Sequence, residues 1–461
     1  MARGKKKESA LTPEEKLAQT LVPVEEQPYK VPTNWCWTRL SNVKSSADGF
    51  FDGDWILSEN MDPDGDVRLL QLSDIGIGEF LDKSNKHISL ITHKKLGCTE
   101  LHPGDVMISR MAEPIARSCI VPAFPYTVIT AVDVAVIRCN CKLINNEFLN
   151  YLCNTKWFTD MAYSMARGTT RVRITRQNLG GMPVPIPPLT EQQRIVDRIE
   201  YLFTKLDEAK EKAQSVLDSF EARKAAILHK AFTGELTAKW RAEHGLSVES
   251  WRQESLANVC TLRSGTTIPS EEELAAGLIP YVKVSDMNLP ENAIQITTSS
   301  RFVNTSPESH LIPYGSTIFP KRGGAILTNK KRFVGVLQII ADLNTMAIIP
   351  IESKLDGWYG YYWMQSIDLR ELNNGSNVPQ INNKDMVKLT VPTPLVEEQK
   401  EIVRILDSLF AKEQQAKEAA EAVLEKIDLL KKSILARAFR GELGTNDVGE
   451  ESALELLKSV L

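Results

Sequence analysis

Two long stretches of the chain carry the same repeat of apolar positions, spaced alternately four and three residues apart. They cover residues 188–236 and 394–443, and after one extra residue early in the second stretch they stay in register at an offset of 207. This alternation is typical of the heptad seam between paired helices. The predicted seam residues are Ile195, Leu202, Leu206, Val216, Phe220 and Ile227 in the first stretch, and Ile402, Leu409, Val423, Ile427, Leu430 and Ile434 in the second.

The ends of both stretches carry helix signals. Each opens at a proline, Pro188 or Pro394, with acidic residues in the first turn, and each closes on A-F-x-G-E-L, whose glycine is a natural helix stop. A helix of about 40 residues, roughly 60 Å long, is too long for one small core to cover. We predict that the two helices of one chain pack against each other, with Arg223 and Glu413 interrupting the stripes at different heights. Two separate dimeric coiled coils are the alternative.

The segments before the two stretches are also duplicated. The pattern W-x-x-x-x-L-x-N-V opens at Trp35 and again at Trp251, and G-T-T-R-V-R-I at 168–174 aligns with G-S-N-V-P-Q-I at 375–381. Residues 129–138 and 334–341 are predicted strands, and residues 146–166 and 358–372 are predicted helices. The expected fold class is therefore α+β, with two mixed α/β domains separated by two long helices in a pseudo-twofold internal repeat.

These patterns set the expected domain boundaries. Each mixed domain precedes a long helix, and acidic residues outnumber basic ones in the C-terminal segment. The expected parts are an N-terminal arm at 1–30, a first mixed domain at 31–189, a central helix at 190–240, a second mixed domain at 245–396, a C-terminal helix at 397–443 and an acidic tail at 444–461.

Composition narrows the class of protein. Of 461 residues 43% are apolar, enough for ordinary cores, and the net charge is −4 with a pI near 6.0. No run of eighteen apolar residues and no N-terminal apolar signal core is present, which favours a cytoplasmic location without membrane insertion. The seven cysteines lack the paired spacing of a zinc site. The net negative charge does not indicate nucleic-acid binding, so that function has to be inferred from local clusters of basic residues.

Two basic stretches without any acid, at 161–190 and 309–341, supply that argument. Such stretches fit phosphate or guanine contacts, although a solvated face or a charged hairpin has the same composition. The small polar loops at 168–173 and 373–377 are further candidates for groove contact. The candidate DNA-binding residues are Arg167, Arg171, Arg173, Arg176, Lys321, Arg322, Lys330, Lys331, Arg332, Asn374 and Ser376.

Catalytic signatures are absent from the sequence. It contains no phosphate-binding loop, no nucleophile elbow, no H-E-x-x-H, no dinucleotide-binding glycine motif and no Asn-Pro-Pro-aromatic amino-methylating motif. The six histidines are scattered and form no ligand set. We therefore expect no catalytic residue, no metal site and no cofactor in this chain.

The arrangement of two variable segments, each followed by a P-L-x-E-Q-type turn, a long helix and A-F-x-G-E-L, closely resembles the specificity subunits of type I restriction-modification systems. The repeated PLTEQQRIV and PLVEEQKEIV segments carry the resemblance most specifically, and it covers roughly residues 31–443. The second turn departs from the family pattern by one extra residue before its EQ pair, and the N-terminal arm is an extension.

The resemblance implies a non-catalytic subunit whose two target recognition domains each read one half of a bipartite double-stranded DNA target. It implies that the helices form an antiparallel coiled coil that fixes the distance between the halves. The implied partners are two modification subunits, which methylate adenine with S-adenosylmethionine, and two restriction subunits, which use ATP and Mg²⁺ to translocate and cleave DNA.

Two other classes of function are alternatives to this one. A scaffold whose coiled coil joins two protein-recognition domains explains the repeat but not the acid-free stretches. A self-contained enzyme, such as a fused methyltransferase and nuclease, needs a cofactor motif that the sequence does not contain. The bases recognised and the length of the gap between them do not follow from composition, because direct readout depends on loop geometry.

Overall fold

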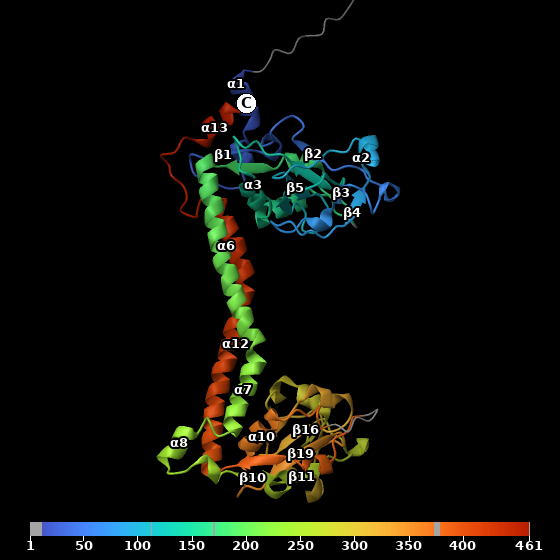
Figure 1. The fold of residues 1–461 in the computed structure, drawn as a ribbon, viewed down its shortest axis with the longest axis vertical. Helices are drawn as coiled ribbons and strands as arrows, with labels where there is room; N and C mark the ends of the chain where they lie inside the picture. The colour runs from blue at the N-terminus through green and yellow to red at the C-terminus, as the bar shows by residue number, and fades with distance from the viewer. Residues whose placement is uncertain (1–11, 112, 169–170, 373–378, 461) are drawn as a thin grey trace, which may run out of the picture. The chain divides into compact units, whose positions relative to one another are not determined.

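The computed structural model describes residues 12–111, 113–168, 171–372 and 379–460. The described residues form two compact units, one of those up to residue 212 together with those from 423 onward, and the other of those between 213 and 422. Each unit holds one mixed domain and one end of each of the two long helices, α6 (Leu189–Asp218) and α12 (Val396–Ala438) (Figure 1). The predicted α+β class, with two mixed domains and a pair of long helices, is confirmed.

The mixed domain of the first unit contains two main sheets and a small pair of strands. The sheet orders are β4-β3-β7 and β2-β8-β5-β6, and β1 pairs with β9. The strands are β1 (Cys36–Arg39), β2 (Phe50–Asp52), β3 (Val67–Leu70), β4 (Lys86–Ile88), β5 (Val106–Ser109), β6 (Ser118–Ile120), β7 (Val128–Thr130), β8 (Val134–Ile137) and β9 (Pro183–Ile186). The helices of this unit beside α6 and α12 are α1 (Pro13–Thr20), α2 (Leu90–Leu96), α3 (Asn146–Cys153), α4 (Lys156–Met165), α5 (Arg176–Gly180) and α13 (Ala453–Ser459).

The mixed domain of the second unit repeats this plan with two additional strands. Its sheet orders are β14-β12-β18-β15 and β11-β19-β16-β17-β13, and β10 pairs with β20. The strands are β10 (Arg252–Ser255), β11 (Cys260–Ser264), β12 (Ile279–Val282), β13 (Gln295–Ile296), β14 (Phe302–Val303), β15 (Ile312–Pro313), β16 (Thr317–Pro320), β17 (Arg332–Val334), β18 (Gln338–Ala341), β19 (Thr345–Pro350) and β20 (Thr390–Thr393). The helices are α7 (Phe220–Phe232), α8 (Ala238–Glu243), α9 (Leu256–Val259), α10 (Gly357–Ser366) and α11 (Asn383–Met386).

The pairings of the strands show the duplication directly. In the first unit β3 runs parallel to β7 and antiparallel to β4, and in the second β12 runs parallel to β18 and antiparallel to β14. The order β2-β8-β5-β6 corresponds to β11-β19-β16-β17. Because neighbours, order and direction all agree, residues at matching strand ends can be compared one by one.

Several predicted elements are divided in the structure. The strand predicted at 129–138 is β7 and β8, and the one predicted at 334–341 is the end of β17 together with β18; in each domain the two strands belong to different sheets. A continuous apolar run does not reveal where the chain leaves one sheet for the next. The helix predicted at 146–166 is α3 and α4, because Thr155 caps a new helix by accepting a hydrogen bond from the Phe158 backbone N–H.

Antiparallel packing of the long helices follows from contacts inside the second unit. The Lys417 ammonium lies 5.1 Å from the centre of the Phe220 ring, and Arg223 pairs with Glu413 at 2.7 Å. Residue numbers rise in one helix while they fall in the other, so the helices run in opposite directions. In the first unit Lys431 in turn pairs with Asp207 at 2.7 Å, where α6 and α12 lie side by side (Figure 1).

Two of the seam residues predicted for the second helix do not face inward. Val423 and Leu430 are 40% and 47% exposed. Between Glu413 and Ala438 the less exposed positions of α12 include a series in steps of four and three, at Glu413, Lys417, Ala420, Leu424, Ile427, Lys431, Ile434 and Ala438; Ala422 and Leu435 are also less exposed. Apolarity alone favoured Val423 and Leu430, whereas the structure uses the aliphatic stems of lysines, whose ammonium groups lie over the rings of Phe220 and Phe203.

The first long helix is interrupted at Ser219, where α6 ends and α7 begins. Arg223 donates from Nη2 to the Val216 carbonyl at 3.2 Å and from Nε to Glu413 at 2.7 Å, and the Ser219 hydroxyl donates to the Ser215 carbonyl. Side chains that take up backbone carbonyls in this way interrupt a helical ladder. The two residues expected at different heights therefore meet in one ion pair.

The repeated E-Q of the two helix starts has one structural explanation in both copies. Gln192 donates to the carbonyls of Leu143 and Pro187 at 3.0 Å each and accepts from the Asn145 N–H at 2.8 Å. Gln399 makes the matching three bonds, to the carbonyls of Lys354 and Pro394 and from the N–H of Asp356, at 2.8, 2.9 and 2.8 Å. Each glutamine thus ties a helix start to the loop before a domain helix.

The preceding glutamate binds the tryptophan that opens each domain. The Trp35 indole N–H donates to Glu191 at 2.8 Å, and that of Trp251 donates to Glu398 at 3.0 Å. Asn446 adds a second bond to Glu191 at 2.8 Å, whereas Glu398 also pairs with Arg241 at 2.6 Å. We call each set a clasp: Trp35, Glu191 and Asn446 in the first unit, and Trp251, Glu398, Thr237 and Arg241 in the second.

The segment predicted as an acidic tail is part of the first unit's core. Ala453 and Leu457 of α13 are buried with the first domain, and Glu450 binds Arg194 through two bonds of 2.8 Å. Gly441 precedes this segment with a φ of 72°, and a Cβ there would lie 2.4 Å from Pro32. Glycine is required at this helix stop by its backbone conformation and by the close approach of Pro32.

Candidate nucleic-acid interface

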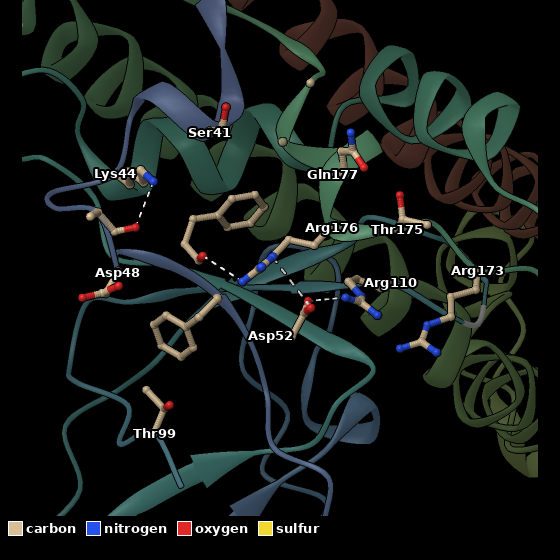
Figure 2. A pocket seen from close by; sticks show the side chains of 15 residues that line it. Ser41, Lys44, Asp48, Asp52, Thr99, Arg110, Arg173, Thr175, Arg176 and Gln177 are labelled. Carbon is tan, nitrogen blue, oxygen red and sulfur yellow. Dashed lines mark hydrogen bonds and ion pairs between the residues drawn. The ribbon is translucent and has the colours of Figure 1, made fainter. Parts of the chain in front are cut away.

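A polar depression of about 1050 Å³ lies where β2, the end of β5 and α5 meet in the first unit. Its lining includes the cations Lys44, Arg110, Arg173 and Arg176 and the carboxylates Asp48 and Asp52, so positive charge is in excess. In Figure 2 Asp52 lies between Arg110 and Arg176. The lining offers guanidinium groups in a concave surface, which suits phosphate and base edges as ligands.

The central carboxylate holds two of these cations in place. Asp52 forms an ion pair with Arg110, whose side chain is mostly buried, and lies 3.7 Å from Nε of Arg176. Arg176 also donates to the Phe50 carbonyl at 3.2 Å. Because both guanidinium groups are fixed within the domain, they can meet a ligand without first losing side-chain freedom.

A narrow hairpin brings Arg173 to the same depression. The backbones of Arg167 and Arg173 exchange two hydrogen bonds of 2.9 Å, and Gly168 turns the chain with a φ of 114°. Arg173 pairs with Asp133 at 3.2 Å, while Arg167 and Arg171 are exposed. The predicted residues Arg167, Arg171, Arg173 and Arg176 are thus gathered by one hairpin and the helix that follows it.

The second unit places Lys321 and Arg322 at the corresponding strand end. Lys321 follows β16 directly, and its N–H donates to the Asn344 carbonyl at 2.8 Å. Its side chain is largely buried, and this burial, followed by the charge of Arg322, lowers the pKa of the Lys321 ammonium. The predicted residues Asn374 and Ser376 lie outside the described residues.

The basic run at 330–332 is occupied within its own domain. Lys331 is 1% exposed and donates to Asn329 at 2.7 Å and to the Ile367 carbonyl at 2.6 Å. Arg332 donates to the Met287 carbonyl at 3.0 Å, and Lys330 bonds to Asn288. In this structure Lys331 therefore positions its own loop, and a charge count along the sequence could not distinguish that role from a surface one.

The family described as "Type I restriction modification DNA specificity domain" matches residues 75–217 and again residues 248–426, which together are more than half of the chain. The chain belongs to this family. It is 27% identical over 347 residues to the type I restriction enzyme EcoDI specificity subunit of Escherichia coli, covering 69% of this chain and 76% of that one. It is 24% identical over 345 residues to the EcoKI specificity subunit of Escherichia coli strain K12, covering 69% and 72%.

Solved structures show the same fold. The HsdS subunit from Thermoanaerobacter tengcongensis matches with a TM-score of 0.67 and 21% identity, over 91% of this chain and 100% of that chain. A chain from a study of complex assembly and conformational transition of the type I R-M system matches with a TM-score of 0.61 and 21% identity, over 90% and 100%. At this identity the likeness concerns the fold alone.

Four charged lining residues of this specificity subunit were missed from the sequence: Lys44, Asp48, Asp52 and Arg110. A signal for Arg110 was present. The segments 101–108 and 311–319 align, and two more residues bring Arg110 opposite Lys321, which was predicted. Lys44 and Asp52 stand alone in mixed-charge segments, so only the fold could place them here.

The described residues of the specificity subunit contain neither a helix suited to a membrane nor a cluster of metal ligands. None of its described helices is long and apolar enough to cross a membrane. Among the same residues, no group of three or more His, Cys, Asp and Glu side chains is placed to hold a metal ion.

Replacing Lys331 should change how stability depends on pH. Burial lowers the pKa of Lys331 from 10.5 to about 8, so between these values the unfolded chain binds more protons than the folded one and the free energy of unfolding rises with pH. Relative to Lys331→Met, the wild-type chain should gain roughly 1.5 kcal/mol between pH 8 and pH 9.5, because the folded amine is still half protonated at pH 8. Urea denaturation followed by circular dichroism measures this difference, in which the titration of groups common to both chains cancels.

Lys330→Met is the matched control for that experiment. Its side chain is more exposed and its amine bonds to the Asn288 side chain, so this variant shows how the loss of a more exposed charge from the same loop affects the curve. Parallel curves for Lys331→Met and the wild type would show that the amine at 331 is not desolvated in the folded chain.

Proposed function

We propose that this specificity subunit reads a bipartite double-stranded DNA target, with one half recognised by each mixed domain and the gap between the halves set by the helix pair. The observation that carries the proposal is the duplication of a whole domain with its clasp, while the matching strand ends carry different side chains, such as Arg110 in the first copy and Lys321 in the second. Two domains with the same backbone fold but different side chains at matching positions suit two half-sites of different sequence.

The partners proposed for the chain are two modification subunits and two restriction subunits. The surfaces most alike in the two copies are the helix starts and the loops that Gln192 and Gln399 hold to them, so we propose one modification subunit at each. The outward side of α12 in the first unit also carries Val423, Leu429 and Leu430, which are exposed apolar residues that a partner could cover.

In this proposal the chain contributes recognition and no catalytic group. S-adenosylmethionine, ATP and Mg²⁺ would serve the partner subunits, since the sequence contains none of the loops that bind such groups. The basic depression would supply phosphate and base contacts, with Arg110 and Arg176 held ready by Asp52.

The alternative is a scaffold that joins two protein-recognition domains. DNA retention by the isolated chain, titrated at several salt concentrations, separates the two functions. We expect binding whose affinity falls steeply with salt, because each phosphate contact releases counterions. Isothermal titration with S-adenosylmethionine should show no binding to the isolated chain but binding to its complex with modification subunits. A chain that retains no DNA, alone or in that complex, would leave the scaffold as the better explanation.

A further inference from the structure

Arg110 and Lys321 occupy the same place in the two domains, as their backbone hydrogen bonds show. Each directly follows a matching strand, β5 or β16. Their carbonyls accept from the N–H groups of Ile174 and Ile381, at 2.9 Å in both domains. Their own N–H groups donate to the carbonyl of the residue just before β8 or β19, at 2.9 and 2.8 Å. The same backbone bonds therefore fix this position in both domains, whichever side chain it carries.

Both positions carry a cation that is more than nine-tenths buried. Arg110 is 6% exposed and Lys321 is 8% exposed. Taking a charge out of water is costly unless the group is paired, and arginine and lysine are almost never buried so deeply without a partner. The partners of these two side chains therefore decide what their charges can do.

Arg110 has a single side-chain partner for the five N–H groups of its guanidinium. Its Nη1 pairs with Asp52. No described residue accepts a hydrogen bond from Nε, which is shielded from water, and none accepts one from Nη2. Figure 2 shows the guanidinium engaged at one end only, in the wall of the depression that it lines. Most of the donors of this buried cation are thus unused within the domain.

Lys321 is compensated even less than Arg110. Among the residues that the structure describes, none forms a hydrogen bond or an ion pair with its ammonium. Burial and the charge of Arg322 lower the pKa of Lys321, while Asp342 raises it from a distance without pairing. A buried charge in this state would be stabilised by an anion that reaches it from outside the domain.

The position that holds the partner of Arg110 has changed between the copies. Asp52 ends β2 and Ser264 ends β11, and each precedes a glycine, Gly53 or Gly265, whose Cβ would lie 2.2 or 1.9 Å from a backbone carbonyl oxygen. A bidentate contact to a base depends on the planar fork of arginine, which lysine lacks, whereas a phosphate oxygen accepts from either cation. The property common to both domains is therefore a fixed positive charge.

The shape of the surface around Arg110 favours the same ligand. The depression has a volume of about 1050 Å³, and its lining also includes Lys44, Arg173 and Arg176. The sugar-phosphate backbone is the outermost part of a DNA duplex, whereas base edges lie inside a major groove about 8.5 Å deep. A buried cation in the wall of a depression can therefore reach a phosphate that projects into it more readily than a base edge.

We propose that positions 110 and 321 are matched phosphate anchors, at which Arg110 and Lys321 each bind one backbone phosphate of the DNA. Such a contact is independent of base sequence, so it sets the register of a domain on its half-site and leaves base reading to other side chains. Asp52 is a positioning residue, because it holds the guanidinium of Arg110. The inference rests on the proposed function, since it assumes that each mixed domain binds one half-site.

Phosphate ethylation interference tests the two contacts directly. The full chain, in complex with modification subunits, is bound to DNA that carries its mapped target and random neutral ethyl phosphates. Arg110→Gln should abolish interference at one phosphate of one half-site, and Lys321→Gln at one phosphate of the other. Each variant should bind about 10-fold to 100-fold more weakly and lower the slope of log affinity against log salt by about 1, with the methylated motif unchanged.

Three controls separate a lost contact from a distorted domain. Arg110→Lys and Lys321→Arg keep the charge and should restore the interference and the salt slope. Lys331→Met removes another buried lysine of the second domain, whose ammonium is already bonded to Asn329 and to the Ile367 carbonyl, so it should leave the interference intact. With the wild-type chain, one methylphosphonate at the identified phosphate should cost as much affinity as Arg110→Gln, and the two changes together no more than either alone.

The failure of this inference can be distinguished from the failure of the proposed function. A methylated motif altered by Arg110→Gln or Lys321→Gln would show that these residues read bases and would overturn the inference. Interference lost in the same half-site for both variants, unchanged in both, or lost equally in Lys331→Met would also contradict it. A wild-type complex that shows no interference on DNA, or methylates no two-part motif, would overturn the proposed function itself.

Discussion

Inserting four residues into each long helix, beside Ala213 and Ala420, should lengthen the unread gap of the DNA target by about two base pairs. Four residues add about 6 Å to a helix, and a base pair rises roughly 3.4 Å. Four residues exceed one full turn by about 40°, so the seam is displaced only by that angle and is tolerated as a stutter. Ala213 and Ala420 are buried small residues, where added turns meet little bulk. Mapping methylated adenines should show both half-sites unchanged.

An insertion into one helix alone is the control. The added residues have no counterpart in the partner helix, so the seam residues of the two helices fall out of register beyond the insertion. The complex should therefore lose most of its methylation activity. Paired insertions that fold and methylate at the original gap would show that the helices do not set the spacing and that some other contact between the recognition domains does.

Replacing Glu398 by alanine should destabilise the second unit far more than the matching change at Glu191 destabilises the first. Glu398 is buried and receives hydrogen bonds from Thr237 at 2.7 Å, Arg241 at 2.6 Å and Trp251 at 3.0 Å. Its loss leaves the largely buried Arg241 guanidinium without a carboxylate, which costs roughly 3–5 kcal/mol. Thermal unfolding of the second unit should move down by about 10 °C.

Glu191→Ala supplies the comparison inside the same chain. Its carboxylate accepts from Trp35 and Asn446 but faces no buried arginine at hydrogen-bond distance, and burial raises its pKa. We expect a loss of about 1–3 kcal/mol, that of two neutral donors left without a partner. Arg241→Met together with Glu398→Met should recover most of the stability. If the double variant is no more stable than Glu398→Ala, the buried charge is not the cause.

The sequence was sufficient to predict the duplication and the pair of long helices, because both depend on patterns repeated over forty residues. It was insufficient at single seam positions. Val423 and Leu430 are apolar yet exposed, while Lys417 and Lys431 face inward, since a lysine stem fills a seam when an aromatic ring receives its ammonium. Which of two neighbouring residues faces inward is decided by the partner helix.

The candidate interface was only partly predictable for a related reason. Arg173 and Arg176 were found because no acid stands near them in the sequence, but Asp52 and Asp133 arrive beside them through the fold. Charge along the chain likewise indicated Lys331, which folding buries against the Ile367 carbonyl. Local composition reports the residues that a loop contains, and tertiary structure decides which of them meet solvent.

The two copies can also be compared as products of a duplication. If the two segments arose from one sequence, a comparison of the two copies shows which positions have diverged and which have not. Gln192 and Gln399 still make the same three backbone bonds, whereas Arg173 and Gln380 no longer share even a charge. A lineage can therefore change the side chains presented at its strand ends while inheriting unaltered the bonds that hold those ends in place.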